Sequence, residues 1–177
     1  MASFNRGLMA TIFVAAALSL VISGMGCQDS SQGWAFAVGD MAPDFTVVSP
    51  DGPWSLGESH GRARLVVFGA SWCPPCRAEM SDITRHLLPR LSNQDTMDVV
   101  MILIDASESS VDRMARTMGA SGPVYADPGG REYHRLARGG IPRSMVVDAR
   151  GRITYLSVGY GTNGWMRLEE LLRAAAR

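Results

Sequence analysis

Long apolar runs alternate with segments of helical periodicity through the middle of the chain. The runs ARLVVFGA, residues 63–70, and DVVMILID, residues 98–105, are almost entirely apolar, as in strands buried on both faces of a sheet. Between them, apolar side chains recur at helical spacing from Pro74 to Leu91. This pattern predicts a strand, a helix and a second strand in succession.

Further patterned segments lie before and after this unit. Residues 44–48 and 53–56 flank the turn signal SPDGP and predict a short hairpin. Ser109 and Asp112 have the spacing of a capping box, which predicts a helix that opens there and ends near Gly119. The hairpin therefore precedes the strand–helix–strand unit, and a helix follows it.

The C-terminal part of the chain predicts a second hairpin and a last helix. Residues 144–159 contain two apolar stretches around the turn at 148–151. Residues 165–176 carry leucines on one helical face. Strand, helix and strand followed by a hairpin and a helix predict an α/β fold with a mixed sheet.

The first 26 residues have the character of an export signal. Residues 8–22 are uncharged. This run is short for a membrane-spanning helix and has the length of the hydrophobic core of a signal peptide. The small residues SGMG then lead to Cys27, so we expect a lipoprotein signal over 1–26 and a lipid on Cys27. Gly24 departs from that signal, which usually has an aliphatic residue there, and an uncleaved anchor or an ordinary cleaved signal remain alternatives. All three place the domain outside the cytoplasm.

The composition and length of the chain after the predicted signal indicate one globular domain. Residues 27–39 begin small and polar and are expected to form a flexible tether, which leaves 40–177 for the domain. A chain of 177 residues buries enough surface to fold without disulfides. Its 17 basic and 17 acidic residues balance, so no nucleic-acid partner is expected.

Two of the three cysteines, Cys73 and Cys76, lie in the motif SWCPPCRAE. A structural zinc site needs four ligands, and the three scattered histidines provide no second pair. Haem attachment needs His directly after the second cysteine, where Arg77 stands. A purely structural disulfide closing about four residues stabilises a chain by only about 2 kcal/mol. Close spacing favours reversible redox chemistry instead, and no metal ligands are expected.

The positions of the two cysteines at the start of the predicted helix indicate different roles for their thiols. The motif follows a buried strand and begins a helix, so Cys73 should lie at the helix N-terminus, where unpaired N–H groups favour a thiolate. We expect Cys73 to attack and the more buried Cys76 to resolve the mixed disulfide. Trp72 supplies an apolar flank for the substrate.

The quoted motif and its surroundings resemble a known family. The run VGDMAPDFTVVSPDG, the segment LVVFGASWCPPCRAEM, and the later VVMILIDASESSVDRM, VYADPGG and GGIPRSMVVDARGRITYLSVGYG are similar to extracytoplasmic thioredoxin-like proteins of the TlpA/ResA type. The resemblance implies a thioredoxin-like fold, with a central mixed sheet flanked by helices and an N-terminal hairpin extension. It also implies a redox-active disulfide, Cys73–Cys76, with no other cofactor.

The same resemblance assigns three more residues. Pro142 matches the family's cis-proline, which faces the cysteine pair, and Ile141 would offer its backbone to an extended substrate by strand addition. Glu79 matches an acidic residue beneath the active site. Because Val67 stands where cytoplasmic thioredoxins have a buried Asp, Glu79 is the carboxyl expected to move protons. The alternative is that Glu79 only stabilises the first turns of its helix.

The resemblance further implies a membrane-attached periplasmic enzyme of the bacterial cell envelope that reduces disulfides in exported proteins. A membrane thiol–disulfide transporter would supply its electrons. Apocytochrome c, a copper-site precursor and misoxidised proteins in general remain open as substrates. A copper-handling module that uses the cysteine pair as ligands is the alternative function, although CPPC lacks a well-placed His. Peroxidase activity is not expected, because Ala70 replaces the Thr of peroxiredoxins.

The two prolines of the motif predict the direction of the chemistry. If Cys73 caps the helix, Pro74 and Pro75 occupy its first two positions and supply no N–H. The sulfur then keeps the N–H of Cys76 as its main donor, with a second available from Arg77. Fewer donors stabilise the thiolate less, so we expect a reductant, nearer to thioredoxin at about −270 mV than to oxidants at about −120 mV.

Overall fold

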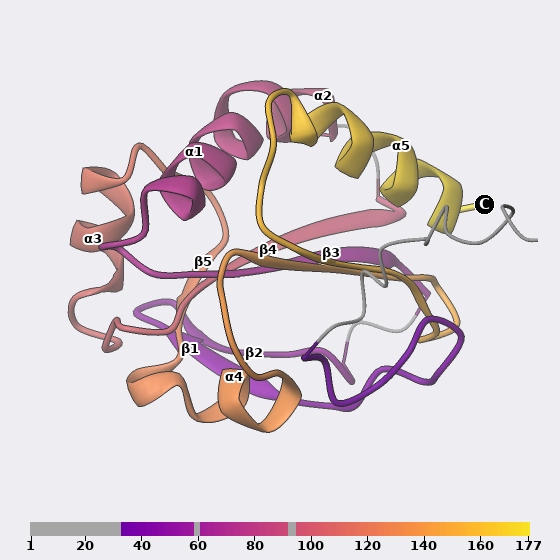
Figure 1. Ribbon diagram of the computed structural model, residues 1–177, viewed down its shortest axis with the longest axis horizontal. Coiled ribbons are helices and arrows are strands. Elements are labelled where there is room, and N and C mark those ends of the chain that lie inside the picture. The colour runs from indigo at the N-terminus through magenta and orange to yellow at the C-terminus, as the bar shows by residue number, and fades with distance from the viewer. Residues whose placement is uncertain (1–32, 59–60, 92–94) are drawn as a thin grey trace, which may run out of the picture.

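The computed structural model describes residues 33–58, 61–91 and 95–177, which form a seven-stranded mixed sheet with helices on both faces (Figure 1). The predicted signal and Cys27 lie outside the described residues. The strands are β1 (Thr46–Ser49), β2 (Gly52–Ser55), β3 (Ala63–Gly69), β4 (Met97–Leu103), β5 (Val124–Ala126), β6 (Arg143–Val147) and β7 (Ile153–Val158). The helical segments are α1 (Pro74–Asp82), η1 (Ile83–Leu87), α2 (Leu88–Leu91), α3 (Val111–Thr117), η2 (Pro128–Gly130), α4 (Arg131–Leu136) and α5 (Gly164–Ala175).

The sheet has the strand order β2-β1-β5-β4-β3-β6-β7, with β3 near its centre. β3 pairs parallel to β4 and antiparallel to β6. All seven residues of β3 are buried, because helices cover both of its faces. The cysteine motif follows β3 directly, so it lies at the carboxyl end of a fully buried strand.

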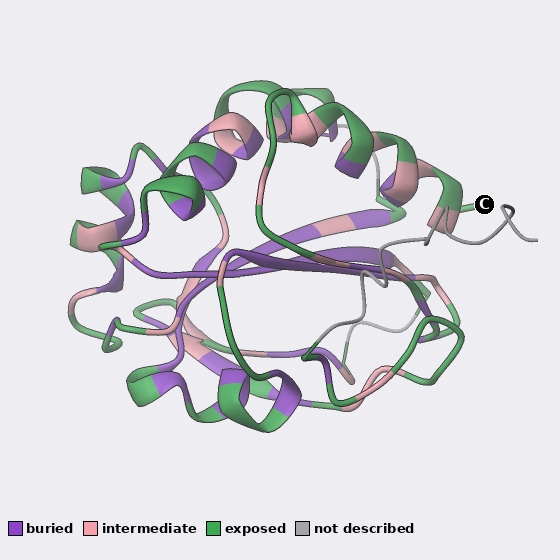
Figure 2. Ribbon diagram, viewed as in Figure 1, coloured by how far each residue is buried: buried purple, intermediate pink, exposed green. Residues whose placement is uncertain are grey.

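Two layers of helix enclose the sheet. Helices α1, α2 and α5 lie over one face, with the single π-helical turn η1 joining α1 to α2, and α4 lies over the other face (Figure 1). Buried residues form one apolar cluster on each side of the sheet. Figure 2 shows these buried positions along the strands and on the inner sides of the helices.

Most predicted elements are present. The hairpin at β1 and β2, both buried strands, the helical stretch from Pro74 to Leu91 and the last helix are confirmed, as is the α/β class with a mixed sheet. The predicted capping box is wrong. α3 begins at Val111 after Ser110, whose hydroxyl contacts Ser107 and gives no side-chain cap.

The N-terminal part of the described chain packs on the domain. Trp34 is buried, forms an antiparallel bridge with Ala137, and packs with Phe36 and Phe68. Gly33, the first described residue, already contacts the domain, and it lies inside the segment predicted as a tether over 27–39. Residues 27–32 lie outside the described residues. Within the described ranges, no helix has the length and apolar character that a membrane crossing requires.

Candidate active site

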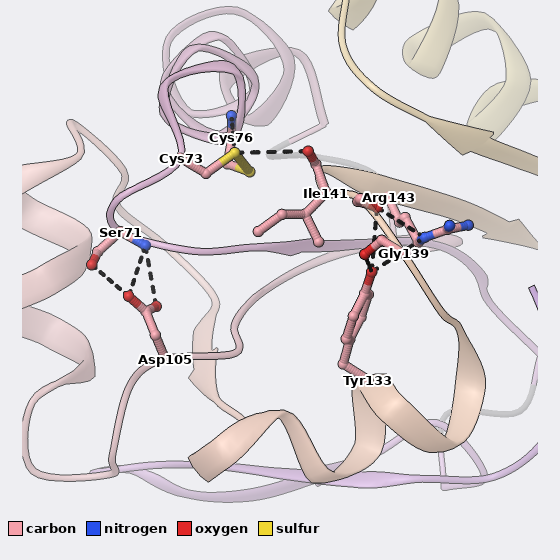
Figure 3. Close-up of a disulfide and its surroundings, with 9 residues drawn as sticks. Ser71, Cys73, Cys76, Asp105, Tyr133, Gly139, Ile141 and Arg143 are labelled. Carbon is pink, nitrogen blue, oxygen red and sulfur yellow. Dashed lines mark hydrogen bonds between the residues drawn. A yellow bond between two sulfur atoms is a disulfide. The ribbon is translucent and has the colours of Figure 1, made fainter. Parts of the chain in front are cut away.

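Cys73 and Cys76 form a disulfide where β3 gives way to α1 (Figure 3). Their Cα atoms lie 5.3 Å apart. Gly69 ends β3 directly beneath them, and a Cβ added there would lie 2.9 Å from the Cβ of Cys76 and 2.9 Å from Cε of Met80. Glycine therefore allows the close approach of α1 to the sheet that places the disulfide at this edge.

The start of α1 has the predicted capping geometry. Cys73 is the N-cap residue, and Pro74 and Pro75 occupy the first two helical positions. The N–H of Cys76 donates to Sγ of Cys73 at 3.3 Å. The N–H of Arg77 donates to the Cys73 carbonyl oxygen at 3.1 Å, so the second donor expected from Arg77 does not reach the sulfur.

The two cysteine residues differ little in exposure in this oxidised state. Cys73 is 4% exposed and Cys76 is fully buried, so Cys76 is the more buried of the two. The side chain beside them is open: Trp72 is 69% exposed. A large exposed apolar side chain therefore lies next to a nearly buried disulfide.

The loop that carries Trp72 is tied to the neighbouring strand. Both the N–H and the hydroxyl of Ser71 donate to the Asp105 carboxylate, the hydroxyl at 2.6 Å. Asp105 follows β4, so these bonds join the carboxyl ends of two parallel strands (Figure 3). Asp105 therefore supports the loop that carries Trp72.

Ile141, which precedes Pro142, lies beside the disulfide. Their peptide bond is cis, and the Ile141 carbonyl oxygen lies 3.8 Å from Sγ of Cys73. The Pro142 carbonyl accepts the N–H of Gly159 at 2.8 Å, which joins this loop to the segment after β7. Ile141 is half-buried and Pro142 is buried, so the isoleucine backbone forms part of the surface around the sulfurs.

Glu79 lies one helical turn beyond Cys76 and is 1% exposed. Burial raises the pKa of its carboxyl to about 7, against the lowering effect of a hydrogen bond from Ser144. The Ser144 hydroxyl donates to Oε1 at 2.5 Å, and the other oxygen, Oε2, is buried with no hydrogen-bond partner. Ser144 pairs across the sheet with Val67, the position where cytoplasmic thioredoxins have their Asp. A protonatable carboxyl is therefore held beneath the disulfide.

One more titratable pair lies near this carboxyl. The Tyr160 hydroxyl donates to Oδ2 of Asp82 at 2.9 Å and accepts the N–H of Trp165. Burial first, and then the bond to Asp82, raise the pKa of Tyr160 above its usual range, and the charge of Glu79 adds to this. Tyr160 therefore stays neutral while Glu79 titrates.

Across the described residues, no three His, Cys, Asp or Glu side chains are grouped so as to hold a metal ion. The groups with chemistry of their own that lie around the disulfide are the two sulfurs and the Glu79 carboxyl. Sequence reasoning missed the contribution of Ser144. The available signal was a hydroxyl within the otherwise apolar strand SMVV, because a buried polar group needs a partner.

Comparison with known proteins identifies the family. Residues 37–172 match the Redoxin family, and the chain belongs to it. The thiol-disulfide oxidoreductase ResA of Geobacillus kaustophilus is 25% identical over 126 residues, which cover 71% of this chain and 71% of that protein. ResA of Oceanobacillus iheyensis is 27% identical over 159 residues, covering 87% and 80%.

The same class appears among solved structures. A thiol:disulfide interchange protein of the thioredoxin family from Chlorobium tepidum superimposes with a TM-score of 0.63 at 28% identity, covering 81% of this chain and 100% of that one. The predicted thioredoxin-like fold and the TlpA/ResA-type family are confirmed. Together with the cysteine pair, these relatives make the protein a thiol–disulfide oxidoreductase that works through its own disulfide.

Proposed function

We propose that the protein is a disulfide reductase of the bacterial periplasm that acts on exported proteins. The observation that carries this proposal is the placement of a buried, protonatable Glu79 one turn beyond Cys76, under a disulfide whose Cys73 lies beside the Ile141 backbone. Such a site supplies a nucleophile, a resolving thiol and a proton acceptor together.

In the forward direction the reduced enzyme carries two thiols. The Cys73 thiolate attacks a substrate disulfide, forms a new S–S bond and releases the first substrate sulfur as a thiolate, which takes up a proton. Cys76 gives its proton to Glu79 and attacks Cys73, which releases the second substrate sulfur as a thiolate. Glu79 then passes its proton to that thiolate, either directly or through solvent, and returns to the carboxylate. The substrate gains two electrons and two protons, and the enzyme ends with the Cys73–Cys76 disulfide.

The proposal also includes an electron donor for the enzyme and its attachment to the membrane. A membrane thiol–disulfide transporter would return the disulfide to the dithiol, and a lipid on Cys27 would hold the domain at the membrane. Mass spectrometry of the membrane-extracted protein should then find a diacylglyceryl group on an N-terminal Cys27. Replacement of that residue by Ser should release the protein from the membrane. An N-terminus at Met1 would contradict the anchor.

Mixed-disulfide trapping tests the exchange itself. A Cys76→Ser variant, reduced and then mixed with a peptide disulfide, should accumulate a covalent adduct through Cys73, because no second thiol resolves it. The matched Cys73→Ser variant should form little adduct, since Cys76 is buried. Absence of an adduct with Cys76→Ser overturns the assignment. In cell envelopes, the same trap would report whether apocytochrome c or other exported proteins are the substrates.

A further inference from the structure

The loop before the cis-proline is held from within by two buried side chains. Arg143 donates from Nη2 to the carbonyl oxygen of Arg138 at 2.6 Å and from Nε to that of Gly140 at 3.0 Å. The Tyr133 hydroxyl donates to the carbonyl oxygen between them, that of Gly139, at 2.7 Å. Each of the three carbonyls before Ile141 thus accepts a hydrogen bond from a buried side chain, and Figure 3 shows the one from Tyr133 to Gly139.

The two side chains are themselves immobilised. Arg143 and Tyr133 are each 2% exposed. Tyr133 packs against Phe68 of β3, and its N–H donates to the buried Asp127 at 2.8 Å. Arg143 pairs with the same Phe68 across β3 and β6, and its Nε also donates to the Tyr133 hydroxyl at 3.3 Å. The loop is therefore connected, through Tyr133 and Arg143, to strand β3 near the centre of the sheet.

The N-terminal segment covers the other side of the guanidinium. The Trp34 ring centroid lies 5.3 Å from Cζ of Arg143, a cation–π distance. The N–H of Arg138 donates to the Gly33 carbonyl oxygen at 2.6 Å. A Cβ at Gly33 would lie 2.6 Å from Nη2 of Arg143 and 2.3 Å from the Arg138 carbonyl oxygen, so only glycine fits there.

We propose that Arg143 is a positioning residue for the exchange reaction. With Tyr133 and the N-terminal segment it fixes the Ile141 backbone beside Cys73, and this placement sets how well the enzyme binds extended peptide disulfides as opposed to small ones. Strand addition requires the Ile141 N–H and carbonyl to meet the substrate backbone in register. A small disulfide needs only access to the sulfur. The inference rests on the proposed function and adds the class of substrate that the loop selects.

The test compares two disulfides in the same assay. The reduced full chain, in detergent, is mixed rapidly with increasing concentrations of a ten-residue peptide disulfide or of bis(2-hydroxyethyl) disulfide. The variants are Tyr133→Phe, which removes one hydroxyl from an intact ring, and Arg143→Gln. Tyr155→Phe and Arg131→Gln are matched controls, since Tyr155 is a half-buried tyrosine of β7 and Arg131 is an exposed arginine of α4.

We expect the ratio of second-order rate constants, peptide over small disulfide, to fall about tenfold in Arg143→Gln, the equivalent of about 1.4 kcal/mol. In Tyr133→Phe it should fall about threefold. The half-saturating peptide concentration should rise while the maximal rate stays unchanged. The two control variants should keep the wild-type ratio of rate constants. An unchanged ratio in Tyr133→Phe, or equal losses on both disulfides, overturns the inference. A wild-type protein that exchanges with neither disulfide overturns the proposed function, and the inference with it.

Discussion

The Ser144 hydroxyl donates a 2.5 Å hydrogen bond to Oε1 of Glu79 and so joins β6 to α1 under the disulfide. Because Oε1 accepts this bond and Oε2 has no partner, the acid form of Glu79 carries its proton on Oε2. The preceding residue, Arg143, binds the carbonyls of the loop before Ile141 on the opposite face of the sheet. Consecutive residues of a strand face opposite sides, so β6 supports both halves of the site.

Removing this hydroxyl should move the pH dependence of exchange. The bond from Ser144 lowers the pKa of Glu79 against the larger effect of burial. In Ser144→Ala the pKa should therefore rise above about 7, and the pH midpoint of mixed-disulfide resolution should move up by about one unit. Single-turnover resolution rates between pH 5 and pH 9 would measure the midpoint. Tyr160 and Asp82, the titratable neighbours, are unchanged in the variant.

Three companion variants separate this effect from packing. Ser144→Thr keeps the hydroxyl donor and should keep the wild-type pH midpoint. Glu79→Gln has no titrating carboxyl, so its pH profile should lack this midpoint and mixed-disulfide resolution should be slower. Ser81→Ala removes a hydroxyl that also lies buried, on the same helix as Glu79, and should leave the profile in place. A midpoint in Ser144→Ala equal to the wild-type value would contradict the role of the bond.

Glu79 should also make folding stability depend on pH. Its folded-state pKa of about 7 lies above the ordinary value of 4.5, so the folded protein holds a proton that the unfolded chain releases. Stability contributed by the neutral acid is present below about 4.5 and is lost as the pH rises to about 7. The loss is on the order of 3 kcal/mol. Urea denaturation of the oxidised protein at pH 5 and pH 8 would show it.

Glu79→Gln should remove that loss, because the amide stays neutral and still accepts the Ser144 bond. Relative to wild type, the variant should gain stability at pH 8 and change little at pH 5. Glu108→Gln, at an exposed position, should follow the wild-type curve. Parallel curves for wild type and Glu79→Gln would show that the carboxyl is ionised in the folded protein at both pH values.

Alkylation of the reduced protein should distinguish the two thiols. Cys73 caps the helix and retains some exposure, whereas Cys76 has none. Iodoacetamide near neutral pH should therefore modify Cys73 at least about tenfold faster, because the thiolate at a helix N-terminus is the reactive form. Peptide mass spectrometry of timed samples would give both rates. Equal rates, or faster labelling of Cys76, would reverse the assignment of attacking and resolving thiols.

The sequence predicted the parts of the fold whose signal is local. Apolar runs and helical periodicity indicated β3, β4 and the stretch from Pro74 to Leu91, and the cysteine spacing indicated the site. β5 has three residues, too few to show a pattern. Trp34 belongs to the core through a bridge to Ala137, about a hundred positions away, which no local pattern reports.

The supporting residues of the site were less predictable for the same reason. Ser144 meets Glu79 across 65 positions, and Arg143 acts on carbonyls whose direction depends on the loop backbone. The one available signal was a serine and an arginine at the start of an apolar strand, because buried polar groups need partners, and it was not used. The partners themselves come from α1 and from the loop after α4, and only the fold brings them together.

The prolines of the motif give the last prediction. Cys73 is the N-cap residue, and its sulfur receives a single backbone N–H, that of Cys76. An N-cap side chain ordinarily also has the N–H of the second helical position within reach, and Pro75 removes it. Pro75→Ala should restore this donor, stabilise the Cys73 thiolate and raise the reduction potential by about 30 mV, the equivalent of about 1.4 kcal/mol.

Equilibration of wild type and variant against a glutathione series measures both potentials. The wild-type value should lie nearer to about −270 mV than to about −120 mV, as expected of a reductant. Pro74→Ala is the matched control, because an N–H at the first helical position points away from the cap side chain, and its potential should stay near that of wild type. A wild-type potential above about −180 mV, or a Pro75→Ala potential at or below that of wild type, would contradict this prediction. The number of backbone N–H donors at the helix start would then not set the reduction potential of this disulfide.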